Sequence, residues 1–389
     1  MTIASDIIYI GVNDHNIDLF EGLYPVPNGM SYNSYIIMDE KIAIMDTVDE
    51  GFYKQWLENI RMALKENKPD YLIVQHMEPD HSANILKLLD EYPETKIVAT
   101  AKAFTMMKNY FGREFEDNRI VVSDGDSLEL GRHELVFVTA PMVHWPEVLV
   151  TYDSTDKILF SADAFGRFGA LDVEIDWLDE ARRYYFGIVG KYGIWVQKLF
   201  KKLEDMEIQM ICPLHGPVLT EDIMYYMKMY NIWSSYKPEE DGIMIAYTSV
   251  YCNTKRAVEL LEERLKEKGC KKVVVRDLAR CDMTEAVSEA FRYSKLVLAT
   301  TTYNAEIFPP MREFLSCLTE RFFSNRLVAI MENGSWAPIV AKLIREKLER
   351  CKGIIFADTV VRMVSTLNGE SLEQLKLMAE ELCRDYESR

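Results

Sequence analysis

A short polar segment, residues 234–242, divides this chain of 389 residues into two parts with different patterns. It consists of Ser-Ser-Tyr-Lys-Pro-Glu-Glu-Asp-Gly and follows a helical pattern that ends at Trp233. The apolar run 243–247 begins directly after it. Proline, glycine and clustered charges are typical of a linker between domains. We therefore predict two domains, residues 1–238 and 239–389, as the chain length also favours.

Histidine and cysteine are distributed unequally between these parts. All six histidines precede residue 239, and six of the seven cysteines follow it. Chemistry that needs imidazole is therefore restricted to the first part. An odd number of cysteines without a CxxC pair is typical of a chain that stays reduced in the cytoplasm.

Charge and hydropathy exclude several classes of protein. The formal net charge of −17 would repel nucleic acids and anionic membranes. No apolar run approaches the ~20 residues of a membrane span, and the N-terminus lacks the basic region of a signal peptide. We expect no nucleic-acid partner and no membrane anchor.

Apolar runs and amphipathic stretches alternate in the second part. The apolar runs are 242–248, 272–276, 295–300, 326–331 and 353–358. The amphipathic stretches after them are 254–268, 283–293, 309–322, 336–350 and 370–387. This alternation predicts a doubly wound α/β domain with five parallel strands covered on both faces.

The first part has a less regular pattern. Short strand patterns occur at 34–38, 42–46, 135–139, 149–152 and 158–161. Helical patterns occur at 51–66, 82–91, 101–111, 178–203 and 220–233. Hairpins mixed with crossover helices predict a β-sandwich flanked by helices.

Four potential metal ligands lie within six residues, directly after the buried strand Tyr71–Gln75. The six residues are His76, Met77, Glu78, Pro79, Asp80 and His81. In an extended chain, His76, Glu78 and Asp80 would point the same way. A helix starting at Ser82 would turn His81 back toward them. We predict a loop that presents imidazole and carboxylate groups to two metal ions.

Three further ligand types, His144, Asp163 and His215, each follow a later apolar run. Functional side chains often lie where buried strands emerge. His15 and His133 have no other ligand type in a matching context, and we expect them to be structural. A mixed set of histidine and carboxylate without cysteine suits iron and oxygen chemistry. We expect two irons, with Asp163 between them, while manganese and zinc remain alternatives.

Polar loops follow the first, third and fourth apolar runs of the second part. In a doubly wound fold these loops meet at the carboxyl ends of the strands, where ligands bind. Hydroxyl groups and a helix N-terminus would bind a phosphate, and aromatic side chains would cover a flavin ring. The glycine fingerprints of dinucleotide and P-loop sites are absent, so we predict FMN. The predicted FMN-binding residues are Thr248, Ser249, Val250, Tyr251, Cys252, Asn253, Thr254, Thr301, Thr302, Tyr303, Asn304, Ala305, Asn333, Gly334, Ser335 and Trp336.

The order of these motifs resembles that of the flavodiiron proteins over essentially the whole chain. The ligands from His76 to His215 resemble those of their metallo-β-lactamase-like domain, and the second part resembles their flavodoxin domain. The resemblance implies an αββα sandwich followed by a flavodoxin-like five-stranded parallel sheet. Metallo-hydrolases carry histidine at the position of Glu78, and this exchange marks the diiron branch. Cys252 departs from the pattern, because a glycine would be expected in the phosphate loop.

The resemblance also implies a role for each ligand. His76, Glu78 and His144 would hold one iron, Asp80 and His215 would hold the second, and Asp163 would bridge them. His81 would be a further ligand that water replaces in some members. Trp145 would pack beside the centre, and one of three tyrosines would supply a nearby phenol. These tyrosines are Tyr184, Tyr185 and Tyr192.

The reaction that the resemblance implies is reduction of dioxygen to water, of nitric oxide to nitrous oxide, or both. Two ferrous irons and a reduced flavin together supply four electrons. In the family, the two cofactors of one chain lie too far apart for rapid transfer, which implies a head-to-tail homodimer or a tetramer. No CxxC…CxxC pattern follows the last helix, so we expect a separate electron donor, either rubredoxin or a reduced deazaflavin.

Two other functions remain open at this point. A dinuclear zinc hydrolase fused to a redox domain could use the same ligands, and metal analysis would distinguish it. A non-catalytic electron carrier would use only the second domain and would leave the ligands of the first without a role. The residues do not distinguish dioxygen from nitric oxide as substrate.

Overall fold

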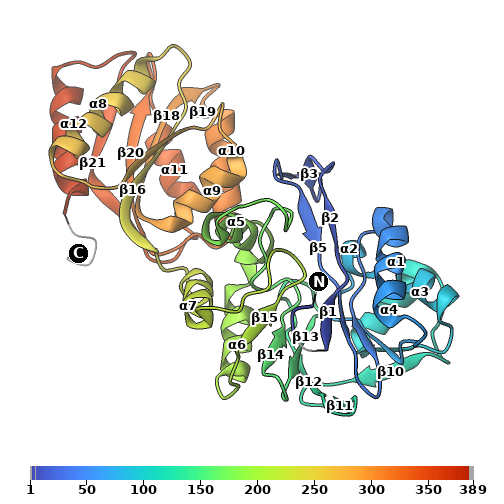
Figure 1. Ribbon diagram of the computed structural model, residues 1–389. Coiled ribbons are helices and arrows are strands. Elements are labelled where there is room, and N and C mark those ends of the chain that lie inside the picture. The colour runs from blue at the N-terminus through green and yellow to red at the C-terminus, as the bar shows by residue number, and fades with distance from the viewer. Residues whose placement is uncertain (1, 5, 385–389) are drawn as a thin grey trace. The chain divides into compact units, whose positions relative to one another are not determined.

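The computed structural model of the chain describes residues 2–4 and 6–384. It divides into two compact units, Met1–Asn231 and Ile232–Arg389 (Figure 1). The predicted domain boundary at residue 238 lies a little beyond this division, between helix α7 (Ile223–Ser234) and strand β16 (Glu240–Tyr247). The position of that boundary stays a prediction.

The first unit contains two sheets that face each other. The first sheet has the order β1 (Ile7–Tyr9), β6 (Tyr35–Ile37), β7 (Ala43–Met45), β8 (Tyr71–Ile73), β9 (Lys96–Thr100), β10 (Arg119–Val122). The second has the order β11 (Ser127–Glu129), β12 (Glu134–Thr139), β13 (Leu149–Asp153), β14 (Ile158–Phe160), β15 (Met210–Cys212). One buried cluster joins them, with Ile73 and Val98 from the first sheet and Phe137 and Phe160 from the second. The predicted sandwich is confirmed.

Two small pairs of strands lie between β1 and β6 of the first sheet, in a stretch for which no elements were predicted. They are β2 (Val12–Asp14) with β5 (Met30–Tyr32), and β3 (Leu19–Phe20) with β4 (Tyr24–Pro25). Strands of two or three residues are too short to show a recognisable alternation of apolar and polar residues.

Helices cover the outer faces of the sandwich (Figure 1). On the outer side of the first sheet lie α1 (Tyr53–Leu64), α3 (Ile85–Glu91) and α4 (Ala101–Phe111), and beside the second lies α6 (Gly193–Leu203). Helix α1 buries Trp56, Ile60 and Leu64 at four-residue spacing, as expected for one apolar face.

The prediction of one continuous helix over 178–203 is wrong. Helix α5 (Trp177–Tyr184) passes into a π-helix (Tyr185–Val189) and a 3-10 turn (Gly190–Tyr192) before α6 begins. Glycines at 187, 190 and 193 weaken the α-helix here. Gly187 also packs so closely that an added Cβ would lie 2.7 Å from the ring of Tyr24.

The second unit is the predicted doubly wound domain with five parallel strands. Its strand order is β17 (Val273–Asp277), β16, β18 (Tyr293–Tyr303), β20 (Arg326–Asn333), β21 (Ile354–Met363), and a short β19 (Glu306–Ile307) pairs with the end of β18. The next two strands in the chain, β17 and β18, lie on opposite sides of β16, so the strand order reverses there. In doubly wound folds the carboxyl end of the sheet at such a point is the usual place for a ligand.

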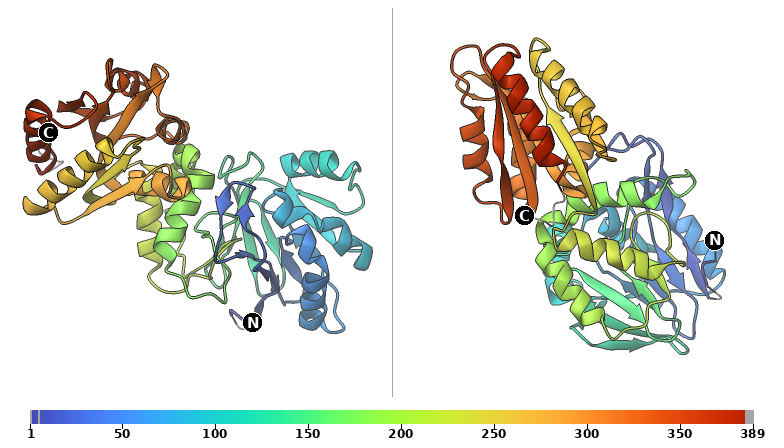
Figure 2. Two further views of the ribbon diagram at one scale, coloured as in Figure 1. Left: turned by 90° about the horizontal axis from the view of Figure 1, so that it is seen from above. Right: turned by 90° about the vertical axis from the view of Figure 1, so that its left-hand side faces the viewer.

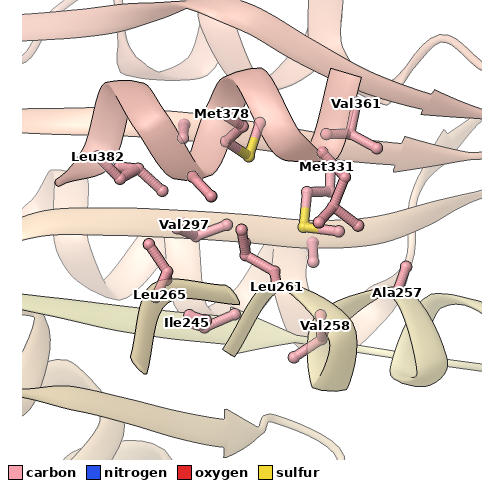
Figure 3. Close-up of a cluster of buried hydrophobic side chains, with 14 of the residues drawn as sticks. Ile245, Ala257, Val258, Leu261, Leu265, Val297, Met331, Val361, Met378 and Leu382 are labelled. Atoms are coloured by element: carbon pink, nitrogen blue, oxygen red, sulfur yellow. The ribbon is translucent and has the colours of Figure 1, made fainter. Parts of the chain in front are cut away.

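Helices cover both faces of this parallel sheet (Figure 2). On one face lie α8 (Asn253–Glu267) and α12 (Gly369–Leu382), and on the other lie α9 (Met283–Arg292), α10 (Pro309–Glu320) and α11 (Val340–Leu348). Figure 3 shows Leu261 and Leu265 of α8 and Met378 and Leu382 of α12 packed over the strands. The last predicted helical residues, 385–387, lie outside the described residues.

Cys270 and Cys383 form a disulfide, with their Cα atoms 6.2 Å apart. The expectation that the cysteines stay reduced is therefore wrong for this pair. The two residues follow α8 and α12, which pack side by side, and cysteine spacing alone does not reveal such a pairing. Of the helices in residues 2–4 and 6–384, none has both the length and the apolar character that crossing a membrane requires.

Candidate metal centre

The loop after β8 carries the first four predicted ligands. Glu78 is extended, as Pro79 favours, with φ −61° and ψ 138°. The prediction that Asp80 continues this extended geometry is wrong, because Pro79 begins the short helix α2 (Pro79–Ser82). Proline suits the first helical position, where its missing N–H leaves no hydrogen bond unmade. The helical turn directs Asp80 and His81 together toward a second point.

The first group of ligand atoms comes from His76, Glu78, His144 and Asp163. The Nε2 atom of His76 lies 3.3 Å from Glu78 Oε2 and 3.2 Å from Asp163 Oδ2. The Nε2 atom of His144 lies 3.1 Å from each of these two oxygens. Ligands bound at about 2.1 Å to one metal ion are separated by about 3 Å, so these four atoms could surround one ion.

The second group comes from Asp80, His81 and His215. The Nε2 atoms of the two histidines are 3.0 Å apart, and Asp80 Oδ2 lies 3.3 Å from each. The Oδ1 atom of Asp163 faces this group, at 3.5 Å from His81 Nε2 and 3.7 Å from His215 Nε2. One oxygen of Asp163 thus faces each group, which is the arrangement of a bridging carboxylate.

The two sheets of the sandwich contribute different ligands. The loop after β8 of the first sheet provides four, and the ends of β12, β14 and β15 of the second sheet provide His144, Asp163 and His215. The structure therefore brings all seven predicted ligand side chains together. Their role as metal ligands stays a prediction.

The chemistry of this donor set fits two cations. Within the described residues, both carboxylate oxygens of Asp80 and of Asp163 are buried without a hydrogen-bond partner. Such buried anions are costly unless a cation compensates them. Burial disfavours the charged form of His144, yet Asp163 and Glu78 outweigh it and raise the pKa of His144 to about 9. Burial raises the pKa of Asp163, yet His76, His144 and His81 hold it well below its usual range. The carboxylates thus hold positive charge on His144, where a metal ion would supply it.

Of the three tyrosines considered above, the structure places Tyr184 beside the centre. Its buried ring lies 5.6 Å from that of His215 between centroids. Burial and the carboxylate of Asp163 raise its pKa well above the usual value, so the phenol stays neutral and can donate a hydrogen bond. Tyr185 instead packs edge-on against Tyr230, 5.1 Å between centroids. Trp145 lies edge-on to His76 at 5.2 Å.

Three carboxylates near the centre were missed by sequence reasoning. Glu147 accepts hydrogen bonds from His76 Nδ1 and from the backbone N–H of Met77. Asp46 accepts from the backbone N–H and side chain of Gln75. Glu21 lies at the turn between β3 and β4, and its pKa is raised to about 8 by desolvation and by Glu78. Of these three, only Glu147 could have been suspected from the sequence, because it lies three residues after the predicted ligand His144.

His15 and His133 lie outside these two ligand groups, although His133 forms a third cluster of potential ligands with Asp6 and Asp156. His15 Nε2 lies 3.1 Å from Asp172 near the surface. His133 Nδ1 lies 2.8 Å from Asp153, and its Nε2 lies 3.1 Å from Asp6 and 3.0 Å from the guanidinium of Arg132. The guanidinium already supplies positive charge between the carboxylates, so this cluster is structural.

The ion pairs of His133 predict a pH-dependent contribution to stability. Burial lowers its pKa, but Asp153 and Asp6 outweigh this effect and raise it. A raised folded pKa stabilises the protein below the unfolded value of about 6.5, and the contribution disappears as pH rises through the folded pKa. At pH 6, wild type should therefore unfold at a higher urea concentration than His133→Gln, and its free energy of unfolding should be larger by about 1–2 kcal/mol. At pH 9 the difference should shrink, and an equal difference at both pH values would contradict this account.

A cleft at the carboxyl ends of β16, β18 and β20 collects residues from all three predicted FMN loops. The residues that line it are Ser249, Val250, Tyr251, Asn253, Thr254, Thr301, Asn333, Gly334, Ser335 and Ser365. Ser365 was not predicted and follows β21. Asn333 is 6% exposed, and its Oδ1 has no hydrogen-bond partner among the described residues. An unused acceptor in this cleft fits an N–H group of a flavin.

The other predicted FMN residues do not line this cleft. Thr248 Oγ1 lies 2.6 Å from Thr300 Oγ1 inside the domain, and Thr302 Oγ1 accepts from the N–H of Ile339. Trp336 is 90% exposed. Four more lie elsewhere in the same loops: Cys252, Tyr303, Asn304 and Ala305. Their part in binding stays a prediction.

Known proteins resemble either part of the first unit or most of the chain. A family model described as ODP family beta lactamase matches residues 30–216. An uncharacterised protein of Methanocaldococcus jannaschii is 30% identical over 322 residues, which is 81% of each chain. A nitric oxide reductase of Moorella thermoacetica is 27% identical over 384 residues, 96% of each chain.

Two solved structures are similar over the whole chain. The rubredoxin oxygen:oxidoreductase of Desulfovibrio gigas has a TM-score of 0.92 and 25% identity, and the match covers 100% of this chain and 98% of that one. The flavodiiron protein of Giardia intestinalis has a TM-score of 0.90 and 23% identity, covering 99% and 97%, and shows the shared fold.

Proposed function

This chain belongs to the flavodiiron protein family, and on that premise we propose that it reduces dioxygen to water, nitric oxide to nitrous oxide, or both. Reduction would take place at a non-haem diiron centre that receives electrons from FMN. The position of Asp163, with one oxygen toward each ligand group, is the observation that supports this proposal most directly.

We assign the ligands to two iron positions. His76, Glu78 and His144 would hold one iron, Asp80, His81 and His215 would hold the other, and Asp163 would bridge them. When bound, the two irons would supply two electrons and polarise the oxygen atoms of a small substrate. The mixture of imidazole and carboxylate, without thiolate, favours iron over a hydrolytic zinc pair.

The residues around the ligands exclude water and hold the imidazoles in place. The ring of Phe20 lies edge-on to His215 at 5.3 Å, and that of Tyr32 at 5.8 Å. The Nδ1 atom of His215 donates to the carbonyl of Ser31 at 2.7 Å, so its Nε2 is directed at the centre. These aromatic rings suit a diatomic gas, which needs no charged group for recognition. The neutral phenol of Tyr184, whose ring packs against His215, would donate a hydrogen bond toward the centre.

The FMN would be held by the cleft of the second unit, with its phosphate near the N-terminus of α8. We propose that a separate donor, rubredoxin or a reduced deazaflavin, supplies the electrons. We also propose a head-to-tail homodimer, or a tetramer of such pairs, in the cytoplasm. The matched oxidoreductases of Moorella and Desulfovibrio support an oxidoreductase of this class.

The decisive experiment combines cofactor analysis with gas reduction. Purified protein is analysed for iron, zinc and FMN, reduced without oxygen, and then exposed in parallel to dioxygen and to nitric oxide. We expect two irons and one FMN per chain, with rapid consumption of at least one gas. Two zincs without iron would contradict the proposal, as would iron-loaded protein that consumes neither gas.

Asn333 provides a separate test of the FMN cleft. Its side-chain N–H group contacts Thr254 Oγ1 and the carbonyl of Ser365, both at 3.3 Å. Asn333→Leu removes these contacts and the unused acceptor, so we expect about tenfold weaker FMN binding, measured by flavin fluorescence on the apoprotein. Ser294→Ala is the control, because Ser294 is a buried polar residue at the amino end of β18 that belongs neither to the cleft nor to the predicted FMN loops. Equal losses in both variants would contradict the cleft as the binding site.

A further inference from the structure

Glu147 is a buried carboxylate that reaches the centre only through another residue. Its side chain is 2% exposed, and its Oε1 accepts hydrogen bonds from His76 Nδ1 at 2.9 Å and from the N–H of Met77 at 2.8 Å. The other ring nitrogen of His76, Nε2, faces Glu78 and Asp163. A proton on Nδ1, shared with Glu147, therefore leaves Nε2 free to bind a metal.

The surrounding chain holds Glu147 in this place. The hydroxyl of Thr100, at the start of α4, donates to the carbonyl of Glu147 at 3.1 Å. The N–H of Leu149 donates to the carbonyl of Gln75 at 3.1 Å. Glu147 thus joins the segment that carries His144 to the loop that carries His76. Both of these histidines belong to the same ligand group.

The histidines of the second group lack such a carboxylate. The Nδ1 atom of His215 donates to a neutral acceptor, the carbonyl of Ser31, at 2.7 Å. The Nδ1 atom of His81 has no hydrogen-bond partner in the described part of the chain. Asp46, another buried carboxylate nearby, directs its hydrogen bonds to Gln75 and to the backbone of His76 rather than to an imidazole.

We propose that Glu147 is a positioning residue that makes the two metal positions unequal. A carboxylate behind a metal-bound imidazole fixes its orientation and makes it a stronger donor, and losing such a partner costs 10–100-fold in metal affinity. The negative charge also favours the ferric over the ferrous ion, because buried charges are weakly screened. Glu147 therefore strengthens binding at the position of His76, Glu78 and His144 and makes that position the first to be oxidised. This inference rests on the proposed diiron function.

The oxidation step transfers one electron and no atoms. In a ferricyanide titration of the reduced protein, an iron held by His76, Glu78 and His144 would give one electron to ferricyanide, and no bond would form or break. The Nδ1 proton would stay shared between His76 and Glu147. The negative charge of Glu147 would stabilise the positive charge gained at this position.

The test compares wild type with Glu147→Gln, both loaded with iron and FMN. Glutamine keeps an oxygen that can accept from both N–H donors but removes the charge. Two readouts do not depend on turnover: the rate of iron release to a ferrous chelator, and a ferricyanide titration followed by the electron paramagnetic resonance of the mixed-valent form. Iron should be released in two phases, one for each iron. In Glu147→Gln we expect one of these phases to be about tenfold faster than in wild type. The flavin is oxidised in the same titration and is followed separately by its absorbance. The potential of the first one-electron oxidation of the iron pair should rise by about 59 mV, the equivalent of a tenfold change, while that of the second iron changes less.

Asp153→Asn is the matched control. Asp153 and His133 form a carboxylate–imidazole pair of the same kind, 2.8 Å apart and fully buried, outside both ligand groups. This variant shows how the loss of such a pair affects folding alone. It should release iron at the wild-type rate and be oxidised at the wild-type potentials. In crystals of Glu147→Gln, anomalous scattering should show lower iron occupancy beside His76 than beside His215.

Other results would overturn the inference. Wild-type release and potentials in Glu147→Gln, equal shifts of both phases, or equal loss of both irons would each do so. If Glu147→Gln does not fold, Glu147→Asp withdraws the charge by one methylene, and unchanged or equally lowered occupancy at the two positions would overturn the inference. The iron content of wild type tests the proposed function, whereas only the difference between variants tests Glu147.

Discussion

The Asp163→Asn protein is expected to bind fewer than two irons per chain and to reduce dioxygen and nitric oxide at least about 100-fold more slowly than wild type. Asp163 is the only predicted ligand whose two oxygens face both groups, with Oδ2 near His76 and His144 and Oδ1 near His81 and His215. An asparagine has a single carbonyl oxygen and no charge. It cannot bridge two cations, and its amide N–H group would point at one of them.

Metal analysis and gas consumption measure the two parts of this prediction. FMN content should stay at the wild-type level, because Asp163 and the FMN cleft belong to different units. Asp153→Asn is the control for this prediction as well, because it removes a buried carboxylate that also contacts a histidine. If Asp163→Asn kept two irons and wild-type rates, Asp163 would not be the bridge.

The ligands could be predicted from the sequence because they follow buried strands. His76, Glu78, Asp80 and His81 are neighbours in the chain, so their clustering needs no knowledge of the fold. His144, Asp163 and His215 were found from their positions after apolar runs. Their meeting with the first four depends on two sheets that face each other across the sandwich. The bridging geometry of Asp163 is a result of that packing and is not visible in any local pattern.

Residues that contact the ligand side chains were harder to predict from the sequence. Tyr184 ends α5 and Tyr185 begins the π-helix, and the two neighbouring rings pack against different residues. Only this packing, Tyr184 against His215 and Tyr185 against Tyr230, shows which phenol lies beside the centre. Glu147 lies three residues after the predicted ligand His144, but only its burial against His76 shows its role.

The flavodoxin-like half was predicted more completely than the first. Each of its five parallel strands contains an apolar run of three to five residues, and each is followed by a helix. The three loops were expected to meet because parallel strands end at one edge. Within those loops, the sequence did not show which hydroxyl groups point inward, and Thr248 and Thr302 are used by the protein itself.

Glu78→His should change the metal that the protein selects. Glu78 Oε2 contacts the Nε2 atoms of His76 and His144 at 3.3 and 3.1 Å. Burial raises the pKa of Glu78, but both histidines outweigh this and hold it well below its usual range, so the group is an anion. Histidine at this position removes one negative charge and gives the first group three imidazoles. Three nitrogen ligands suit zinc, whereas carboxylates favour the higher charge that iron acquires on oxidation.

We therefore expect Glu78→His, produced with both metals present, to lose iron and gain zinc, and to reduce either gas at least about 100-fold more slowly. FMN content should not change. Glu78→Asp is the matched control: it keeps the charge but retracts the carboxylate, so it should retain iron while turnover falls. If metal selection depended on the size of the site instead of its charge, Glu78→Asp would lose iron as well. If Glu78→His kept two irons and full activity, the carboxylate would have no part in choosing the metal, and the exchange that separates this chain from the metallo-hydrolase pattern would need another explanation.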